Sequence, residues 1–110
     1  MPDKSWKATE RAVARLLGGE RVPINGRIRG RSEPDIEHER LSLEVKHRRT
    51  IPAWIEDALA QAESSSTDGK LPVAVLHGNG ARYGKSLCVL RLESLQELLQ
   101  KGESIDGSQP

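Results

Sequence analysis

Hydrophobic residues recur every three or four positions in some parts of the chain and alternate with polar residues in others, which predicts helices and strands respectively. The helical spacing predicts a first helix over about residues 5–17, with Ser5 as its N-cap. A second helix is expected over about residues 50–63, with Thr50 at the cap and Pro52 in the first turn. Its buried side is expected to consist of Ile51, Ile55, Ala58, Leu59 and Ala62.

The end of the chain has the pattern of a helix start followed by a tail. Ser94–Glu97 forms a capping box, which predicts a short third helix. Residues 102–110 are polar and are expected to be a disordered tail. A single domain over residues 1–101 is therefore predicted, since 110 residues suffice for one modest core.

Five short segments have the alternating or continuously apolar pattern of strands. The segment over 71–77 is apolar nearly throughout and follows a helix, so we expect it to join the main sheet by a crossover and to be buried on both faces. The predicted order is α-β-β-β-α-β-β-α. The fold class is therefore α/β, with a central mixed β-sheet flanked by helices.

A tight hairpin around Glu39-Arg40 would bring two carboxylates together. Symmetric pairing sets Asp35 directly opposite Glu44, at a Cβ separation of roughly 4.5–5.5 Å. Two acids this close repel unless a cation lies between them or one is protonated. The pattern predicts a divalent-metal site, with Glu37 as an alternative ligand; a solvated charged hairpin is the competing interpretation. The full set of expected pairs is Glu37 with Ser42, Ile36 with Leu43, and Asp35 with Glu44.

Glu10 lies within the apolar stripe of the first predicted helix. A carboxylate on a buried face must be paired, protonated or bound to metal. The alternative is a position at the edge of the stripe, where Glu10 reaches solvent, Arg11 or Arg15. The stripe itself comprises Trp6, Val13 and Leu17, with Leu16 beside them.

Composition narrows the class of protein. Cys88 is the only cysteine, which excludes an internal disulfide and a Cys-rich zinc site, and its apolar surroundings predict a buried, inert thiol. No apolar run approaches the roughly 20 residues of a membrane span, and the N-terminus lacks a signal-peptide pattern. We expect a soluble protein without a membrane partner, located in the cytoplasm (the host cytoplasm if it is encoded by a phage).

Residues 1–31 carry eight Lys or Arg against three acids, although the whole chain has a net charge of only +1. A basic segment beside a carboxylate cluster suits a polyanionic substrate held against a metal. Residues 47–49 are expected to contact phosphates or to form a solvated strand end, and the loop at Arg82 is expected to be a flexible DNA-contacting loop or a simple hairpin tip. The contacts to nucleic acid expected from charge are Arg27, Arg29, Arg31, His47, Arg48, Arg49, Arg82 and Lys85. The Gly-rich loop around Arg82 is followed by a strand pattern where a nucleotide-binding loop requires a helix, so no nucleotide cofactor is expected.

Pro34-Asp35, followed by Glu44-Val45-Lys46 and preceded by a helical Glu10, resembles the PD-(D/E)XK nuclease superfamily. The similarity is greatest to its Holliday-junction resolvase branch, of the archaeal and phage type, and it covers the element order from about residue 5 to 100. The resemblance implies a restriction-endonuclease-like domain and a homodimer that cleaves four-way DNA junctions formed in recombination.

The same resemblance assigns roles to individual residues. Asp35, Glu44 and the backbone carbonyl of Val45 would bind Mg²⁺, for which Mn²⁺ is expected to substitute. Ser32 stands where some relatives carry a serine close to the site, and it would contact nucleic acid there. Glu10 would complete the acidic cluster directly or through water, and Lys46 would orient the attacking water and stabilise developing negative charge. Two alternatives remain open: a restriction or repair nuclease of this superfamily without junction selectivity, and a catalytically silent DNA-binding module on the same fold.

Overall fold

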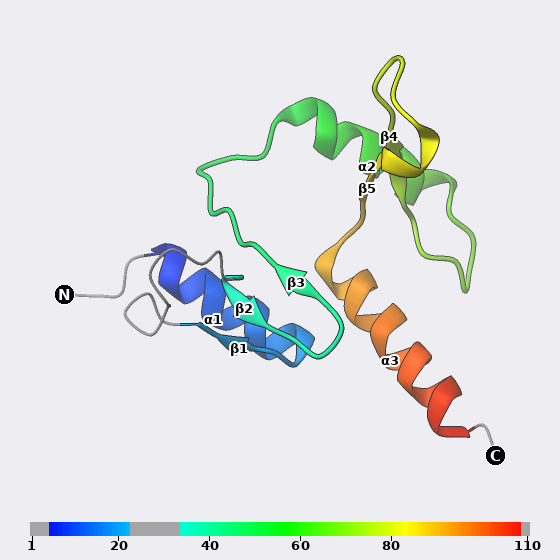
Figure 1. Cartoon of the computed structure of the whole chain (residues 1–110). Coiled ribbons are helices and arrows are strands. Elements are labelled where there is room, and N and C mark those ends of the chain that lie inside the picture. The colour runs from blue at the N-terminus through cyan, green and yellow to red at the C-terminus, as the bar shows by residue number, and fades with distance from the viewer. Residues whose placement is uncertain (1–4, 23–33, 109–110) are drawn as a thin grey trace. The chain divides into compact units, whose positions relative to one another are not determined.

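The computed structural model of the chain describes residues 5–22 and 34–108, with side chains up to residue 102. It divides into two compact units, Met1–Arg49 and Thr50–Pro110 (Figure 1). The described elements follow the predicted order, with one additional 3₁₀ turn in the second unit. The fold is therefore α/β. None of the described helices combines the length and the apolar character that crossing a bilayer requires.

The first unit is a helix beside a small antiparallel sheet. Helix α1 spans Ser5–Leu17, as predicted, and ends at Gly18, whose φ of 82° suits a residue without a Cβ. The described sheet has the order β1-β2-β3, with each strand antiparallel to its neighbour. The strands are two residues each: β1 Glu20–Arg21, β2 Ile36–Glu37 and β3 Ser42–Leu43.

Ile36 is the centre of this unit, because its side chain is fully buried. Ala14 and Leu17 of α1 are also buried, while Leu16 is exposed, so Ala14 belongs to the inner face of the helix and Leu16 does not. Gly19 makes the close approach of helix and sheet possible. A Cβ on Gly19 would lie 2.5 Å from the carbonyl oxygen of Glu37 and 2.7 Å from Cγ2 of Ile36.

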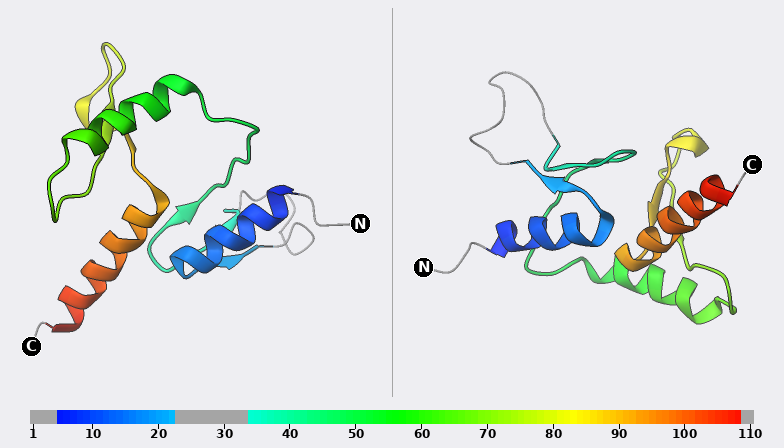
Figure 2. Two further views of the ribbon diagram at one scale, coloured as in Figure 1. Left: turned by 180° about the vertical axis from the view of Figure 1, so that it is seen from behind. Right: turned by 90° about the horizontal axis from the view of Figure 1, so that it is seen from below.

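The second unit contains a hairpin and two helices. Helix α2 spans Ala53–Ser65 and helix α3 spans Leu92–Ser108. The antiparallel hairpin between them is formed by β4 Ala74–Leu76 and β5 Leu87–Val89, with the 3₁₀ helix η2 Tyr83–Lys85 in its loop. Figure 2 shows this hairpin and both helices from two further directions.

The pairing of β4 differs from the expected single mixed sheet. Among the described residues β4 pairs only with β5, so there are two separate antiparallel sheets. The expectation that 71–77 is buried on both faces is wrong, since Val75 is 65% exposed while its neighbour Ala74 is buried. Cys88, the partner of Val75 across the ladder, is exposed rather than buried. One face of a two-stranded hairpin can remain open even when its residues are apolar.

The helix ends also differ from the sequence predictions. Pro52, with a ψ of 134°, is the N-cap of α2, so Thr50 is not the cap and Ile51 lies outside the helix, half exposed. A residue before proline is disfavoured in the helical region, which prevents an earlier start. Helix α3 begins at Leu92 because the carbonyl of Arg91 accepts its first helical bonds, and it continues to Ser108 where a tail was expected.

Substitution of Gly19 tests the close packing of α1 against the sheet. Gly19→Ala is expected to destabilise the first unit by about 1–3 kcal/mol, the usual cost of overpacking, because the new methyl group meets backbone. Gly84→Ala is the matched control, since nothing lies within 4 Å of its added Cβ. Chemical denaturation measures both, and equal stability of the two variants would contradict the described packing.

A second prediction concerns the pH dependence of the second unit. Arg91 donates to Glu56 (3.0 Å) and to both oxygens of Glu63 (2.9 and 3.2 Å), which joins α2 to the start of α3. The hydrogen bonds from Arg91 hold the pKa of Glu63 below its ordinary value of 4.5. The stabilisation is complete above that ordinary value and is lost as the pH falls through the lowered pKa of the folded state.

Glu63→Gln should therefore lower the melting temperature at pH 7, and the difference from wild type should shrink under acidic conditions below the lowered pKa. The loss should be greatest at low salt, because the pair is exposed. Asp57→Asn, on the same helix, is the control. If the melting temperatures of Glu63→Gln and wild type differ by the same amount at pH 7 and in the acidic condition, the carboxylate charge does not contribute to stability.

Candidate active site

The hairpin that carries the candidate residues contains two of the three predicted strand pairs, and Asp35 with Glu44 is not among its ladder pairs. Ile36 pairs with Leu43, and Glu37 pairs with Ser42. Asp35 continues the contact beyond these pairs: its N–H donates to the carbonyl of Leu43 at 2.9 Å, and its Oδ2 accepts the N–H of Val45 at 2.7 Å. The partners in these two hydrogen bonds, Leu43 and Val45, are the residues directly before and after Glu44. The structure thus brings Asp35 against the segment that contains Glu44 and Val45.

The backbone of Asp35 departs from a regular ladder. In a regular hydrogen-bonded pair, a residue exchanges both backbone bonds with one partner. Asp35 instead donates to Leu43 of β3 and accepts from the N–H of Val22, next to β1, at 2.9 Å. Its side chain therefore binds the amide of Val45, a charge-assisted bond of the stronger class. The half-buried carboxylate is held in one orientation as a result.

Residues 41–46 alternate between half-buried and exposed positions, in step with their alternating apolar and polar residues. Leu41, Leu43 and Val45 are half-buried, whereas Ser42, Glu44 and Lys46 are exposed. Glu44 and Lys46 are consequently available to a ligand on the outer side of this segment. The alternation places a carboxylate and an ammonium two residues apart, with the Val45 backbone between them.

Glu10 is buried, and its partner is a cation. Nε of Arg21 donates to Oε1 of Glu10 at 2.6 Å, and their side chains are 18% and 7% exposed. The guanidinium of Arg21 also lies over the Trp6 ring, 5.7 Å from its centroid. Of the three states open to a buried carboxylate, Glu10 is in the paired one. Its partner comes from β1, and not from Arg11 or Arg15 of α1 itself.

Thr9, next to Glu10, connects α1 to the segment that follows Lys46. Its hydroxyl donates to the carbonyl of Ser5 at 2.9 Å and lies 2.7 Å from Nδ1 of His47. Because the single hydroxyl proton is committed to Ser5, Nδ1 of His47 is the donor in this contact. His47, proposed from sequence as a phosphate contact, is therefore also a structural link to α1, while Arg48 and Arg49 beyond it are exposed.

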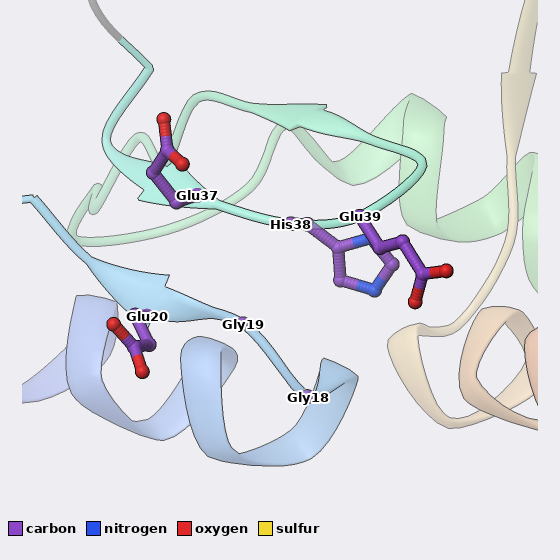
Figure 3. Close-up of a pocket in the computed structure, with 6 residues that line it drawn as sticks. All are labelled: Gly18, Gly19, Glu20, Glu37, His38 and Glu39. Atoms are coloured by element: carbon purple, nitrogen blue, oxygen red, sulfur yellow. The ribbon is translucent and has the colours of Figure 1, made fainter.

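A shallow pocket of about 250 Å³ lies where α1 meets the hairpin, lined by Gly18, Gly19, Glu20, Glu37, His38 and Glu39. Its three carboxylates point in different directions and do not converge (Figure 3). His38 is fixed by two bonds: Nε2 donates to the carbonyl of Leu17 at 2.9 Å, and Nδ1 accepts the N–H of Arg40 at 3.0 Å. Glu37, the alternative ligand, belongs to this pocket.

The donor set offered by the hairpin suits a hard divalent cation, since the carboxylates of Asp35 and Glu44 and the carbonyl of Val45 are all oxygen ligands. Within residues 5–22 and 34–102, no three His, Cys, Asp or Glu side chains gather into a metal-binding group. Mg²⁺ commonly uses only one or two carboxylates and retains several waters. The hairpin therefore fits Mg²⁺ in its chemistry, with Glu10 engaged elsewhere by Arg21.

The remaining predicted contacts to nucleic acid fall into two groups. Arg27, Arg29, Arg31 and Ser32 lie outside the described residues. Arg82 and Lys85 belong to the second unit, where both are exposed at η2. Comparison of the chain with protein-family models, with curated proteins and with solved structures finds no match.

The pair of Glu10 and Arg21 is a feature that sequence analysis did not anticipate, and it can be tested by unfolding in urea. Arg21→Ala leaves a buried carboxylate without this partner and should cost about 2–4 kcal/mol. Glu10→Gln keeps an oxygen acceptor for Arg21 and should cost less. Arg15→Ala, an exposed position on the same helix, is the control. A variant Arg21→Ala as stable as wild type would contradict the structural role of the pair.

Proposed function

We propose that this chain is a Mg²⁺-dependent endodeoxyribonuclease of the PD-(D/E)XK type, acting on branched DNA such as four-way junctions. The observation that carries the proposal is the pair of hydrogen bonds that Asp35 makes with the two neighbours of Glu44, donating to Leu43 and accepting from Val45. They hold the two candidate carboxylates on adjoining segments of one hairpin, and Lys46 follows on the exposed side.

In this proposal the hairpin residues have separate roles. Asp35, Glu44 and the Val45 carbonyl bind the cation, and the Val45 amide keeps the Asp35 carboxylate oriented. The bound cation supplies Lewis acidity toward the phosphate and lowers the pKa of water. The ammonium of Lys46 orients the attacking water and stabilises the negative charge that develops on the phosphate oxygens. Glu10, held by Arg21, contributes by fixing β1 against α1.

The wider proposal includes a restriction-endonuclease-like arrangement and a two-fold homodimer. The order of helices and strands supports the former. Cleavage of two symmetric strands requires two active sites, which is the reason for the dimer. Residues 1–31 contain eight basic residues and three acids, and this positive balance supports a polyanionic substrate.

One observation favours a second function, a DNA-binding module on the same fold without catalysis. The buried Glu10 is neutralised by Arg21, and no three acidic or His side chains converge in the part of the chain that the structure describes. A module of this kind would use its basic residues to bind phosphates and would have no need of a cation at Asp35.

Cleavage of labelled DNA tests the catalytic assignment. Wild-type protein with Mg²⁺ should cut a four-way junction more efficiently than linear duplex. Asp35→Asn removes a charge but keeps an oxygen to accept the Val45 N–H, and it should abolish cleavage; Lys46→Ala should reduce it about 10²–10³-fold. Glu39→Gln, an exposed acid at the hairpin turn, is the control. Equal activity of wild type, Asp35→Asn and Lys46→Ala would end the assignment.

Titration calorimetry with Mn²⁺ separates the two functions. A nuclease should take up Mn²⁺ with measurable heat in the absence of DNA, and Asp35→Asn should weaken this uptake while leaving the unfolding curve unchanged. Junction cleavage greater than duplex cleavage would favour a resolvase, whereas equal cleavage would favour a restriction or repair enzyme. Absence of both cation uptake and cleavage, with DNA binding retained, would favour the silent module.

A further inference from the structure

The loop between β4 and β5 presents the most exposed aromatic side chain among the described residues. Tyr83 is 85% exposed, although large aromatic side chains usually find a place in a core. In Figure 1 this loop, drawn in yellow, projects from the hairpin of the second unit, and Figure 2 shows the same projection from behind. The whole chain has only three Trp or Tyr residues and no Phe, so the exposure of one of them requires an explanation.

Among the described residues, Tyr83 makes a ring contact on one side, with His77. Its ring stacks on His77, with ring centroids 4.7 Å apart and planes inclined by 26°. Nδ1 of His77 lies 2.8 Å from Oγ of Ser86, which fixes the imidazole. A flat ring supported on one face and 85% exposed leaves its opposite face open to a second flat group.

The backbone of the loop is also ordered by hydrogen bonds. The N–H groups of Ala81, Lys85 and Ser86 donate to the carbonyls of Gly78, Arg82 and Tyr83 at 3.0, 3.0 and 3.1 Å. Of a flexible loop and a simple hairpin tip, these turns favour a tip with a defined conformation. A ligand would therefore meet a preorganised surface and avoid the cost of ordering it.

The stretch of sequence around Tyr83 carries charge of a single sign. Residues 69–92 contain no Asp or Glu, and the two cations nearest Tyr83 in sequence, Arg82 and Lys85, are both exposed. Proteins that bind single-stranded nucleic acid combine this arrangement of cations for the backbone with an aromatic ring on which a base stacks. An acidic peptide could satisfy the cations, but it would not use the open face of the ring.

We propose that the tip formed by His77, Arg82, Tyr83 and Lys85 is a binding site for an unpaired nucleotide, with its base stacked on Tyr83 and its phosphates on Arg82 and Lys85. The inference goes beyond the proposed cleavage, because it concerns the second unit and requires neither a cation nor Asp35. Unpaired or splayed bases occur at branch points and strand ends, so such a site would favour those substrates over continuous duplex.

The test is fluorescence anisotropy of the full chain with a fluorescein-labelled oligothymidylate and with a blunt duplex, in EDTA so that no cleavage intervenes. Tyr83→Ala should weaken binding of the single strand about tenfold or more, as loss of one stacked base does, and should change duplex binding little. Tyr83→Phe keeps the ring and should bind like wild type. Trp54→Ala removes another exposed aromatic (62%), beside Glu56 and Asp57 in sequence, and should have no effect.

Several results would overturn the proposal: no binding of the single strand by wild type, equal affinities of wild type and Tyr83→Ala, or an equal loss in Tyr83→Ala and Trp54→Ala. A loss of duplex binding as large as that of the single strand would also overturn it, since it would indicate phosphate contact alone. Asp35→Asn should bind the single strand like wild type. The site at Tyr83 and the nuclease at Asp35 can therefore fail independently.

Discussion

The hydrogen bond from the Val45 amide to the Asp35 carboxylate is the interaction on which the candidate site depends. It exists because Asp35 divides its backbone bonds between Val22, next to β1, and Leu43 of β3, and therefore presents its side chain to the next amide of the neighbouring segment. A carboxylate fixed in this way is already oriented before any ligand arrives, and the backbone of Val45 is held beside it. The orientation of the Asp35 carboxylate is therefore set by the hydrogen bonds of the hairpin itself.

The support beneath this hairpin is a chain of close contacts. Gly19 allows α1 to approach the backbone of Glu37, and Ile36 fills the space between helix and sheet. Arg21 then returns from β1 to neutralise Glu10 on the inner face of α1. A buried ion pair of this kind gains little over an apolar pair, but loss of one partner is costly, so it specifies one placement of β1 against the helix.

Much of the first unit could be predicted from the sequence, because local rules decide it. The 3.6-residue spacing and Gly18 fixed α1, and a turn at Glu39-Arg40 predicted the two pairs that the hairpin contains. The burial of Glu10 also followed from its position in the apolar stripe. Its partner did not, since Arg21 reaches it only through the turn at Gly18-Gly19. The hydrogen bond from Val45 to the Asp35 side chain depends on the irregular backbone bonding of Asp35, which the pattern of residues does not predict.

The second unit was predicted less well, for a different reason. An apolar run such as 71–77 indicates a strand, but it contains no information about which strand it pairs with or how many of its faces are covered. The open face with Val75 and Cys88 is the result. Pro52 likewise decides the start of α2 through its own backbone angles, which outweigh the capping tendency of Thr50.

The strands of the first unit are only two residues long, and Ile36 is the one large side chain among the described residues that is completely removed from solvent. Little free energy therefore opposes a local opening of this sheet, and its amide protons should exchange with water readily. A ligand held by both Asp35 and Glu44 would add a second link between these segments beside the hydrogen bond from Val45 to Asp35. A ligand that binds only the closed sheet stabilises that sheet by mass action, so slower amide exchange in the sheet would report ligand binding at the hairpin.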